Sequence, residues 1–195
     1  MLPRQIAWLQ AVTILWMVAE CAVSLRAAVQ AHSAALLAFG ADSLIELLSA
    51  IVVLLQFIPR FPLRKPQAER TAAILLMVLA VAIVWIAVSS WRRRVEPSPL
   101  GIAITALALI VMPVLAALKR RQARILNNRV LAADATQSAT CSWLAAVTLA
   151  GLAINFVWHI PWIDSVAALA AVPILLVEGQ RTWRGDPCSC GCAVS

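Results

Sequence analysis

Long apolar segments are the feature of this chain that most limits its fold. A helix needs about 17 to 25 mainly apolar residues to cross the hydrocarbon core of a bilayer. Six such windows follow one another, over Gln5–Leu25, Ser33–Ile58, Ala68–Trp91, Pro99–Leu118, Val130–Val157 and Trp162–Val177. Hydrophobic residues make up 63% of the 195 positions and charged residues 13%, whereas soluble domains hold about 45–50% and 25%. We therefore predict an all-α, polytopic membrane protein with six transmembrane helices.

Almost the whole sequence is used by these windows. The first window lacks a small-residue cleavage site and is followed at once by more hydrophobic chain, so we interpret it as a retained helix. Residues 1–183 are expected to form the six-helix transmembrane domain, and residues 184–195 a short cytoplasmic tail that contains cysteines. No soluble domain is predicted.

Basic residues gather on one side of the predicted membrane domain. The chain has a formal net charge of +7, and twelve of its 16 Lys and Arg residues fall at one end of the predicted helices. The positive-inside rule then places both termini in the cytoplasm of a cell membrane of the bacterial inner-membrane type. The largest basic group is interpreted as a determinant of this topology, and it comprises Lys119, Arg120, Arg121, Arg124 and Arg129. The positive charge is thereby explained without a nucleic acid partner.

Two carboxylates interrupt the second apolar window. Asp42 and Glu46 are four residues apart and share one face of a helix. A charged side chain near the middle of a membrane helix costs at least about 2.5 to 3.5 kcal/mol, so such residues usually line a protein cavity or an ion path. We predict that this pair binds a divalent cation. The alternative is a structural pair that is partly protonated or matched to arginines.

A second polar stripe lies in the fifth window. Asp134, Ser138 and Cys141 are spaced i, i+4 and i+7, which puts a carboxylate, a hydroxyl and a thiol on one helical face. With Asp42 and Glu46 these groups could complete a cation site. Ser and Cys also serve as small packing residues in membrane helices, so Cys141 is predicted only as an additional ligand.

Two other acidic residues, Glu20 and Asp164, could have structural or functional roles. Glu20, in the first window, could relay protons, join the cation site or pair with Arg26 near the outer surface. Asp164 opens the sixth window, where a carboxylate can cap the N-terminus of the helix.

Three cysteines stand close together in the predicted tail. Cys188, Cys190 and Cys192 form a C-x-C-x-C run. In a reducing compartment such thiols more often bind metal or react than form structural disulfides, and three thiolates favour soft or borderline metals. They form a second candidate metal site, unless the tail simply carries free cysteines.

Four stretches of the chain resemble the transmembrane domain of the cation diffusion facilitator, or cation efflux, family. They are AHSAALLAFGADSLIELLSA, AERTAAILLMVL, ARILNNRVLAADATQS and IPWIDSVAALAAVPILLVEGQ, and the resemblance extends over about Glu20 to Glu178. The family's second and fifth helices each supply two ligands, four residues apart, to a divalent cation. By that resemblance Asp42 and Glu46 match the first pair and Asp134 begins the second, while Ser138 stands where Asp is usual. The cytoplasmic domain typical of the family is not recognised after the sixth window.

The resemblance implies proton-coupled export of a cation by a homodimer. We therefore expect a secondary transporter that exports a divalent transition metal by proton antiport, with zinc, cobalt, cadmium, manganese or iron as its substrate and no prosthetic group. The alternative is a membrane-anchored metal sensor or metallochaperone that works through the cysteine tail. An enzyme is not expected, because the sequence lacks a Ser/His/Asp arrangement, an HExxH motif and a phosphate-binding glycine loop.

Overall fold

Six helices make up the part of the chain that the structure, a computed structural model, describes. That part comprises residues 4–55, 65–91, 95–96, 98–127, 129–160 and 162–184, and it contains no strand. The helices are α1 (Arg4–Ala31), α2 (Ala34–Leu55), α3 (Lys65–Ser89), α4 (Pro99–Ile125), α5 (Arg129–Trp158) and α6 (Ile163–Arg184). The predicted all-α fold is confirmed, although α1, α4 and α6 continue well beyond the ends of their apolar windows.

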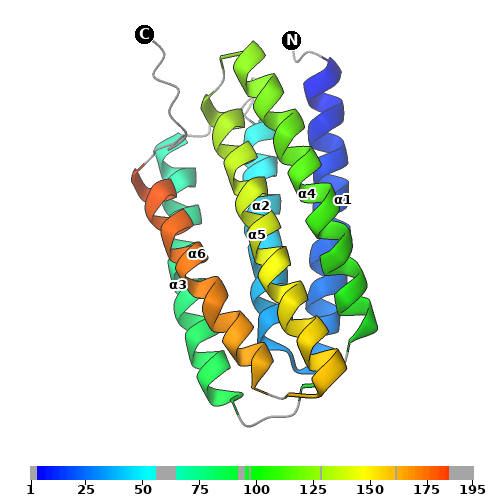
Figure 1. The fold of residues 1–195 in the computed structure, drawn as a ribbon. Coiled ribbons are helices and arrows are strands. Elements are labelled where there is room, and N and C mark those ends of the chain that lie inside the picture. The colour runs from blue at the N-terminus through cyan, green and yellow to red at the C-terminus, as the bar shows by residue number, and fades with distance from the viewer. Residues whose placement is uncertain are drawn as a thin grey trace.

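Successive helices run in opposite directions along a common axis. In Figure 1, α1 begins and α6 ends at the same end of the bundle, which we call the terminal end, and the α1–α2 connection lies at the other end. Within the described residues, four helical stretches are long and apolar enough to cross a membrane, and α3 adds a shorter apolar stretch, Ala73–Ser89. The alternation of six helices agrees with a multi-pass membrane protein.

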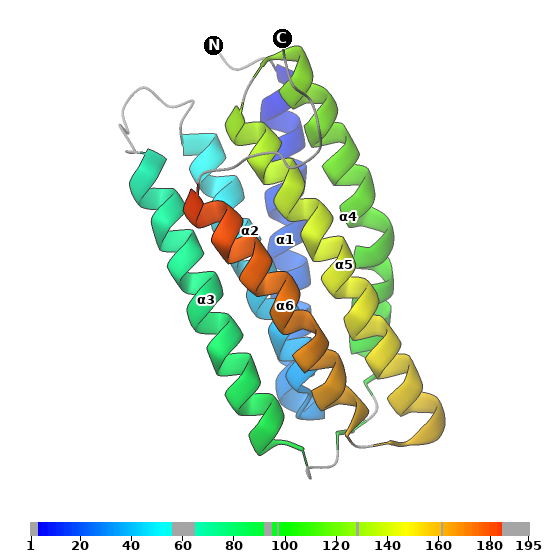
Figure 2. The ribbon, with the colours of Figure 1, turned by 60° about the vertical axis from the view of Figure 1, so that its left-hand side comes forward.

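The helices pack as a group of four (α1, α2, α4 and α5) with a pair (α3 and α6) at its side. The most extensive contacts are α4 with α5, α3 with α6 and α1 with α2, and α2 also contacts α3, α5 and α6. Figure 2 shows α3 and α6 together on one flank of the bundle. Consequently α2 and α5, the two helices with polar stripes, meet in the interior.

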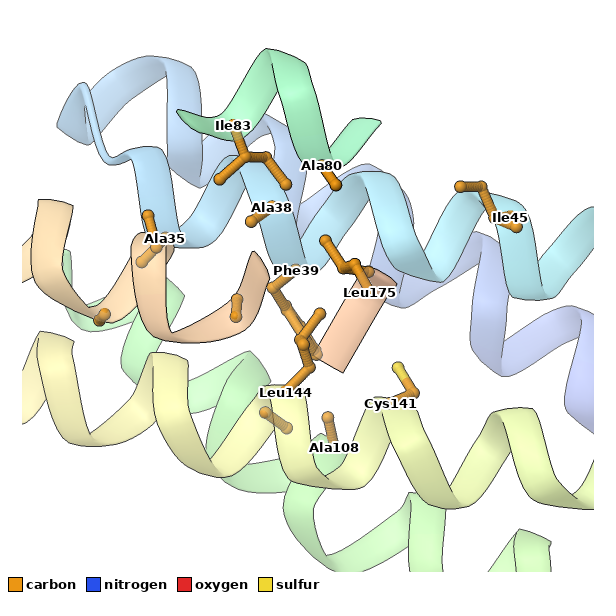
Figure 3. Close-up of a cluster of buried hydrophobic side chains, with 14 of the residues drawn as sticks. Ala35, Ala38, Phe39, Ile45, Ala80, Ile83, Ala108, Cys141, Leu144 and Leu175 are labelled. Carbon is orange, nitrogen blue, oxygen red and sulfur yellow. The ribbon is translucent and has the colours of Figure 1, made fainter. Parts of the chain in front are cut away.

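Small and large apolar side chains alternate in the core. Figure 3 shows Phe39, Leu144 and Leu175 close together where α2, α5 and α6 meet, with Ala38, Ala80 and Ala108 nearby. At Gly151 a Cβ atom would lie 2.5 Å from the Cβ of Ala167, so α5 and α6 can approach this closely only because glycine has no side chain.

Large apolar side chains also cover the outside of the bundle. On α3, Val81 is 70% and Trp85 76% exposed, whereas Leu76, Ala80 and Ile83 on its other face are buried. An outward apolar face and an apolar interior together are what a helix needs between lipid and protein.

Asp164 caps a helix, but not the one predicted. Its Oδ1 accepts a hydrogen bond from the Ser33 hydroxyl, and its Oδ2 accepts from the backbone N–H groups of Ala34 (2.7 Å) and Ala35 (3.3 Å). Asp164 lies in the first turn of α6, yet the donors belong to the N-terminus of α2. The cap therefore ties α6 to α2, which sequence proximity could not indicate.

Candidate cation site

The predicted ligands on α2 and α5 are all buried. Asp42, Glu46, Asp134 and Ser138 are each no more than 2% exposed. Ser138 Oγ donates a hydrogen bond to Glu46 Oε1, which joins the two helices directly. Asp134 lies one turn earlier on α5, and its backbone oxygen is 3.3 Å from Ser138 Oγ. The structure thus brings Glu46, Asp134 and Ser138 into one network.

Lys119 completes this network and was assigned wrongly from the sequence. It was grouped with the basic residues that set topology, but α4 continues to Ile125 and Lys119 is fully buried. Its Nζ lies 3.0 Å from Asp134 Oδ2 and 3.7 Å from Glu46 Oε1, and donates to Ser138 Oγ over 2.8 Å. An ammonium group buried this deeply needs such partners, because an unpaired charge in the interior is very unfavourable.

A periodic signal for Lys119 exists in the sequence. The buried positions of α4 include Ala108, Met112, Leu115 and Lys119, which recur every three or four residues. Lys119 thus continues the inward face of the helix, while its neighbours Arg120 and Arg121 are exposed. This periodicity was overlooked because Lys119 is followed directly by arginines, and all of these basic residues were interpreted together.

Gln10 brings a fourth helix to the same place. This buried residue of α1 donates from Nε2 to Asp134 Oδ2 over 3.2 Å. Gln10 was not predicted from the sequence, although a glutamine inside an apolar window is itself a signal. Helices α1, α2, α4 and α5 therefore each contribute a polar side chain to the network of Gln10, Glu46, Lys119, Asp134 and Ser138, which we call the lysine centre.

Several oxygen atoms of the lysine centre have no hydrogen-bond partner among the residues that the structure describes. They are Gln10 Oε1, Glu46 Oε2 and Asp134 Oδ1, all buried. A buried acceptor left unpaired costs about 1–3 kcal/mol, and native proteins retain few of them without a reason such as a bound ion or water. The lysine centre therefore contains acceptor oxygens that the described side chains leave unused, while the position between its carboxylates is taken by the Lys119 ammonium.

Glu20 belongs to a second polar cluster, beside the first. Its carboxylate accepts hydrogen bonds from Trp16 Nε1 and from Ser43 Oγ at 2.6 Å, and Cys141 Sγ lies 3.8 Å away. The predicted alternative of a Glu20–Arg26 pair is not found in the described part of the chain, where the ion pairs within 4.0 Å all involve Lys119. Glu20 is thus held in the interior, between α1, α2 and α5.

Asp42 is buried on α2, one turn before Glu46, and among the described residues no hydrogen bond or ion pair joins it to the lysine centre. The Cys141 thiol lies on the same face of α5 as Asp134 and Ser138, but its hydrogen bond goes to Glu20 of the second cluster. Glu178 of α6 accepts a hydrogen bond from Thr140 Oγ1 of α5 at 3.1 Å. Cys141 therefore contacts the Glu20 carboxylate, and its role as an additional metal ligand stays a prediction.

The carboxylates are not gathered as ligands around one point. Among the residues that the structure describes, no three His, Cys, Asp or Glu side chains are arranged to hold a common metal ion. The predicted tail site of Cys188, Cys190 and Cys192 lies outside the described residues. In this arrangement the position between Glu46, Asp134 and Ser138 is taken by the Lys119 ammonium.

The fold and the site define a class: a polytopic α-helical membrane protein with charged side chains buried between its helices. Residues 64–184, more than half of the chain, match the family model of the cation efflux transmembrane domain. The protein therefore belongs to the cation efflux family, a family of cation transporters. The match includes Lys119, Asp134 and Ser138, whereas Asp42 and Glu46 precede it. A comparison with curated proteins found no match.

Proposed function

We propose that this protein exports a divalent transition-metal cation from the cytoplasm in exchange for protons. The observation that carries the proposal is the meeting of buried carboxylates from α2 and α5, Glu46 and Asp134, around the Lys119 ammonium, in a member of a cation transporter family. Oxygen ligands of this kind suit zinc, cobalt, cadmium, manganese or iron(II) ions.

Proton exchange follows from the chemistry of the ligands. A carboxylate coordinates a metal ion only in its ionised form, so metal binding releases any proton that the group carried. Asp42, Glu46 and Asp134 are the proposed ligands, with Ser138 adding an oxygen and Cys141 an optional thiol. The unpaired Oε2 of Glu46 and Oδ1 of Asp134 are the atoms available to either a metal ion or a proton.

Topology and assembly complete the proposal. The basic residues near the terminal end place both termini in the cytoplasm by the positive-inside rule. The exposed apolar face of α3 suits contact with lipid or with a second copy of the chain in a homodimer. The alternative function, a sensor or metallochaperone, depends on the C-x-C-x-C tail.

Metal-driven proton flux tests the proposal. Purified protein in proteoliposomes is given zinc, cobalt, manganese, iron(II) or cadmium while internal pH is recorded. We expect flux with at least one metal and its loss in Asp42→Asn, whereas Asp164→Asn, a buried cap outside both clusters, is the matched control and keeps flux per folded molecule.

The same assay separates the two functions. Replacing Cys188, Cys190 and Cys192 together by Ser should leave flux unchanged if the helices transport the metal. Absence of flux for every metal, together with tight metal binding that the triple variant loses, would overturn transport in favour of the sensor or metallochaperone.

A further inference from the structure

Lys119 occupies the place of a bound cation. An ammonium group has three N–H donors, and three oxygen-bearing side chains from two other helices surround this one. Nζ is 2.8 Å from Ser138 Oγ, 3.0 Å from Asp134 Oδ2 and 3.7 Å from Glu46 Oε1. These are three of the residues proposed to coordinate the transported metal. The chain therefore presents a cation of its own to the metal's ligands.

A metal ion and this ammonium group exclude each other. An ion held by the carboxylates of Glu46 and Asp134 would share their oxygens with Nζ or lie beside it, and two cations that close repel strongly in a buried, weakly screened place. Lys119 therefore has to leave before a divalent ion can bind to both carboxylates.

The position of Lys119 on α4 gives it a way out. It lies six residues before Ile125, the last residue of the helix, or about 9 Å along the axis. Beyond it, Arg120, Arg121 and Arg124 are already exposed at the terminal end. A lysine has a flexible four-carbon stem and can extend its charge along a helix toward water, so modest movement of α4 or of the side chain would free the oxygens.

We propose that Lys119 is a tethered cation that holds the metal's ligands in the metal-free state and is displaced by the metal ion. It would keep Glu46 and Asp134 paired when no metal is present, so that the empty site does not carry two unpaired buried charges. Lys119 would also lower the affinity of the site for the metal ion, which favours release of the ion. The inference rests on the proposed function, because it concerns the same site.

Affinity of the metal-free protein for Zn²⁺ gives the first test. Lys119→Gln keeps a polar side chain of similar reach but removes the charge, and Lys119→Arg keeps the charge as the matched control. By calorimetry in lipid nanodiscs we expect Lys119→Gln to bind Zn²⁺ at least about tenfold more tightly than wild type. A divalent ion about 4 Å from an ammonium group is repelled by more than that factor even in the dielectric of water.

A structural role for Lys119 predicts the opposite sign. If the lysine only holds the helices together, Lys119→Gln loosens the site and binds Zn²⁺ no more tightly than wild type, which would overturn the inference. If wild type binds Zn²⁺ and Asp42→Asn does not, the proposed function survives that failure. Absence of binding of every metal used in the flux assay, in wild type and variant alike, would overturn both.

A second measurement needs no variant and covers the case in which Lys119→Gln does not fold. The sequence holds one other lysine, Lys65, which serves as an internal reference for an amine-acylating reagent. Lys119 is fully buried in the described structure, so Zn²⁺ should increase its acylation relative to Lys65, as measured by peptide mass spectrometry. Unchanged or reduced acylation of Lys119 under saturating Zn²⁺ would mean that the ammonium stays in place.

Discussion

Two buried aspartates at opposite ends of the bundle differ in how completely they are satisfied. Asp164 uses both carboxylate oxygens, which accept from Ser33 and from two backbone N–H groups of α2. Asp134 Oδ2 accepts from the Gln10 amide and contacts the Lys119 ammonium, while its Oδ1 has no partner within the described part of the chain. A carboxylate whose two oxygens both accept hydrogen bonds has a structural role, whereas one with an unpaired oxygen can still bind a proton or a cation. Burial alone does not distinguish the two roles.

The largest expected difference between the two aspartates is in transport. Asp134→Asn should reduce metal flux in proteoliposomes by more than about 100-fold, because loss of a direct ligand should exceed the 10- to 100-fold typical of supporting residues. Asp164→Asn, normalised to folded protein, should retain flux. Equal losses of flux in the two variants would show that the two aspartates do not differ in their role in transport.

Unpairing the lysine centre should have the largest effect on stability. Asp134→Asn leaves Lys119 without its closest carboxylate, and breaking a buried ion pair costs about 3–5 kcal/mol. Adding Lys119→Gln to this variant should restore part of the loss. The four proteins form a double-mutant cycle, measured as free energies of unfolding in mixed micelles. Additive losses would show that Lys119 and Asp134 are not coupled in the folded protein.

The cap at the other end should have a moderate effect on stability. Asp164→Asn removes the charge from hydrogen bonds to the α2 N-terminus, and such charge-assisted bonds contribute about 1.5–3 kcal/mol. Ser33→Ala should cost about 1 kcal/mol, as is usual for a lost N-terminal cap. Both changes are measured by the same unfolding assay. If Asp164→Asn had the same free energy of unfolding as wild type, the structural role of Asp164 would be contradicted.

Cys141 should have the smallest effect. Its sulfur lies 3.8 Å from Glu20 Oε1, a long contact, and it belongs to the second polar cluster and not to the lysine centre. Cys141→Ala should retain flux within about threefold, which is less than 1 kcal/mol of barrier. A loss approaching that of Asp134→Asn would instead establish the thiol as a metal ligand.

Much of the architecture could be predicted because its signal is local. Apolar windows located the six helices, and i, i+4 spacing selected Asp42, Glu46, Asp134 and Ser138, all of which are buried. The network in which Lys119 joins Glu46, Asp134 and Ser138 could not be predicted in this way. Spacing states which residues share a face of one helix, but not which faces of different helices meet.

Positive charge in the sequence was the least reliable predictor of where a side chain lies in the fold. Lys119 and Arg120 are adjacent, and a count of positive residues treats them alike. A turn of about 100° per residue separates them on the helix, so one faces α5 and the other is exposed. Asp164 was correctly associated with a helix terminus, but its partner lies about 130 residues earlier in the chain.

The sequence by itself determined the membrane character, the number of helices and the presence of unusual buried acids, because bilayer thickness and helical periodicity act along a single segment. Only the tertiary structure decided which charges neutralise one another. Gln10, Glu46, Lys119 and Asp134 come from four helices, and their contacts depend on how those helices pack. The arrangement that puts the Lys119 ammonium between Glu46, Asp134 and Ser138 exists only in the assembled bundle.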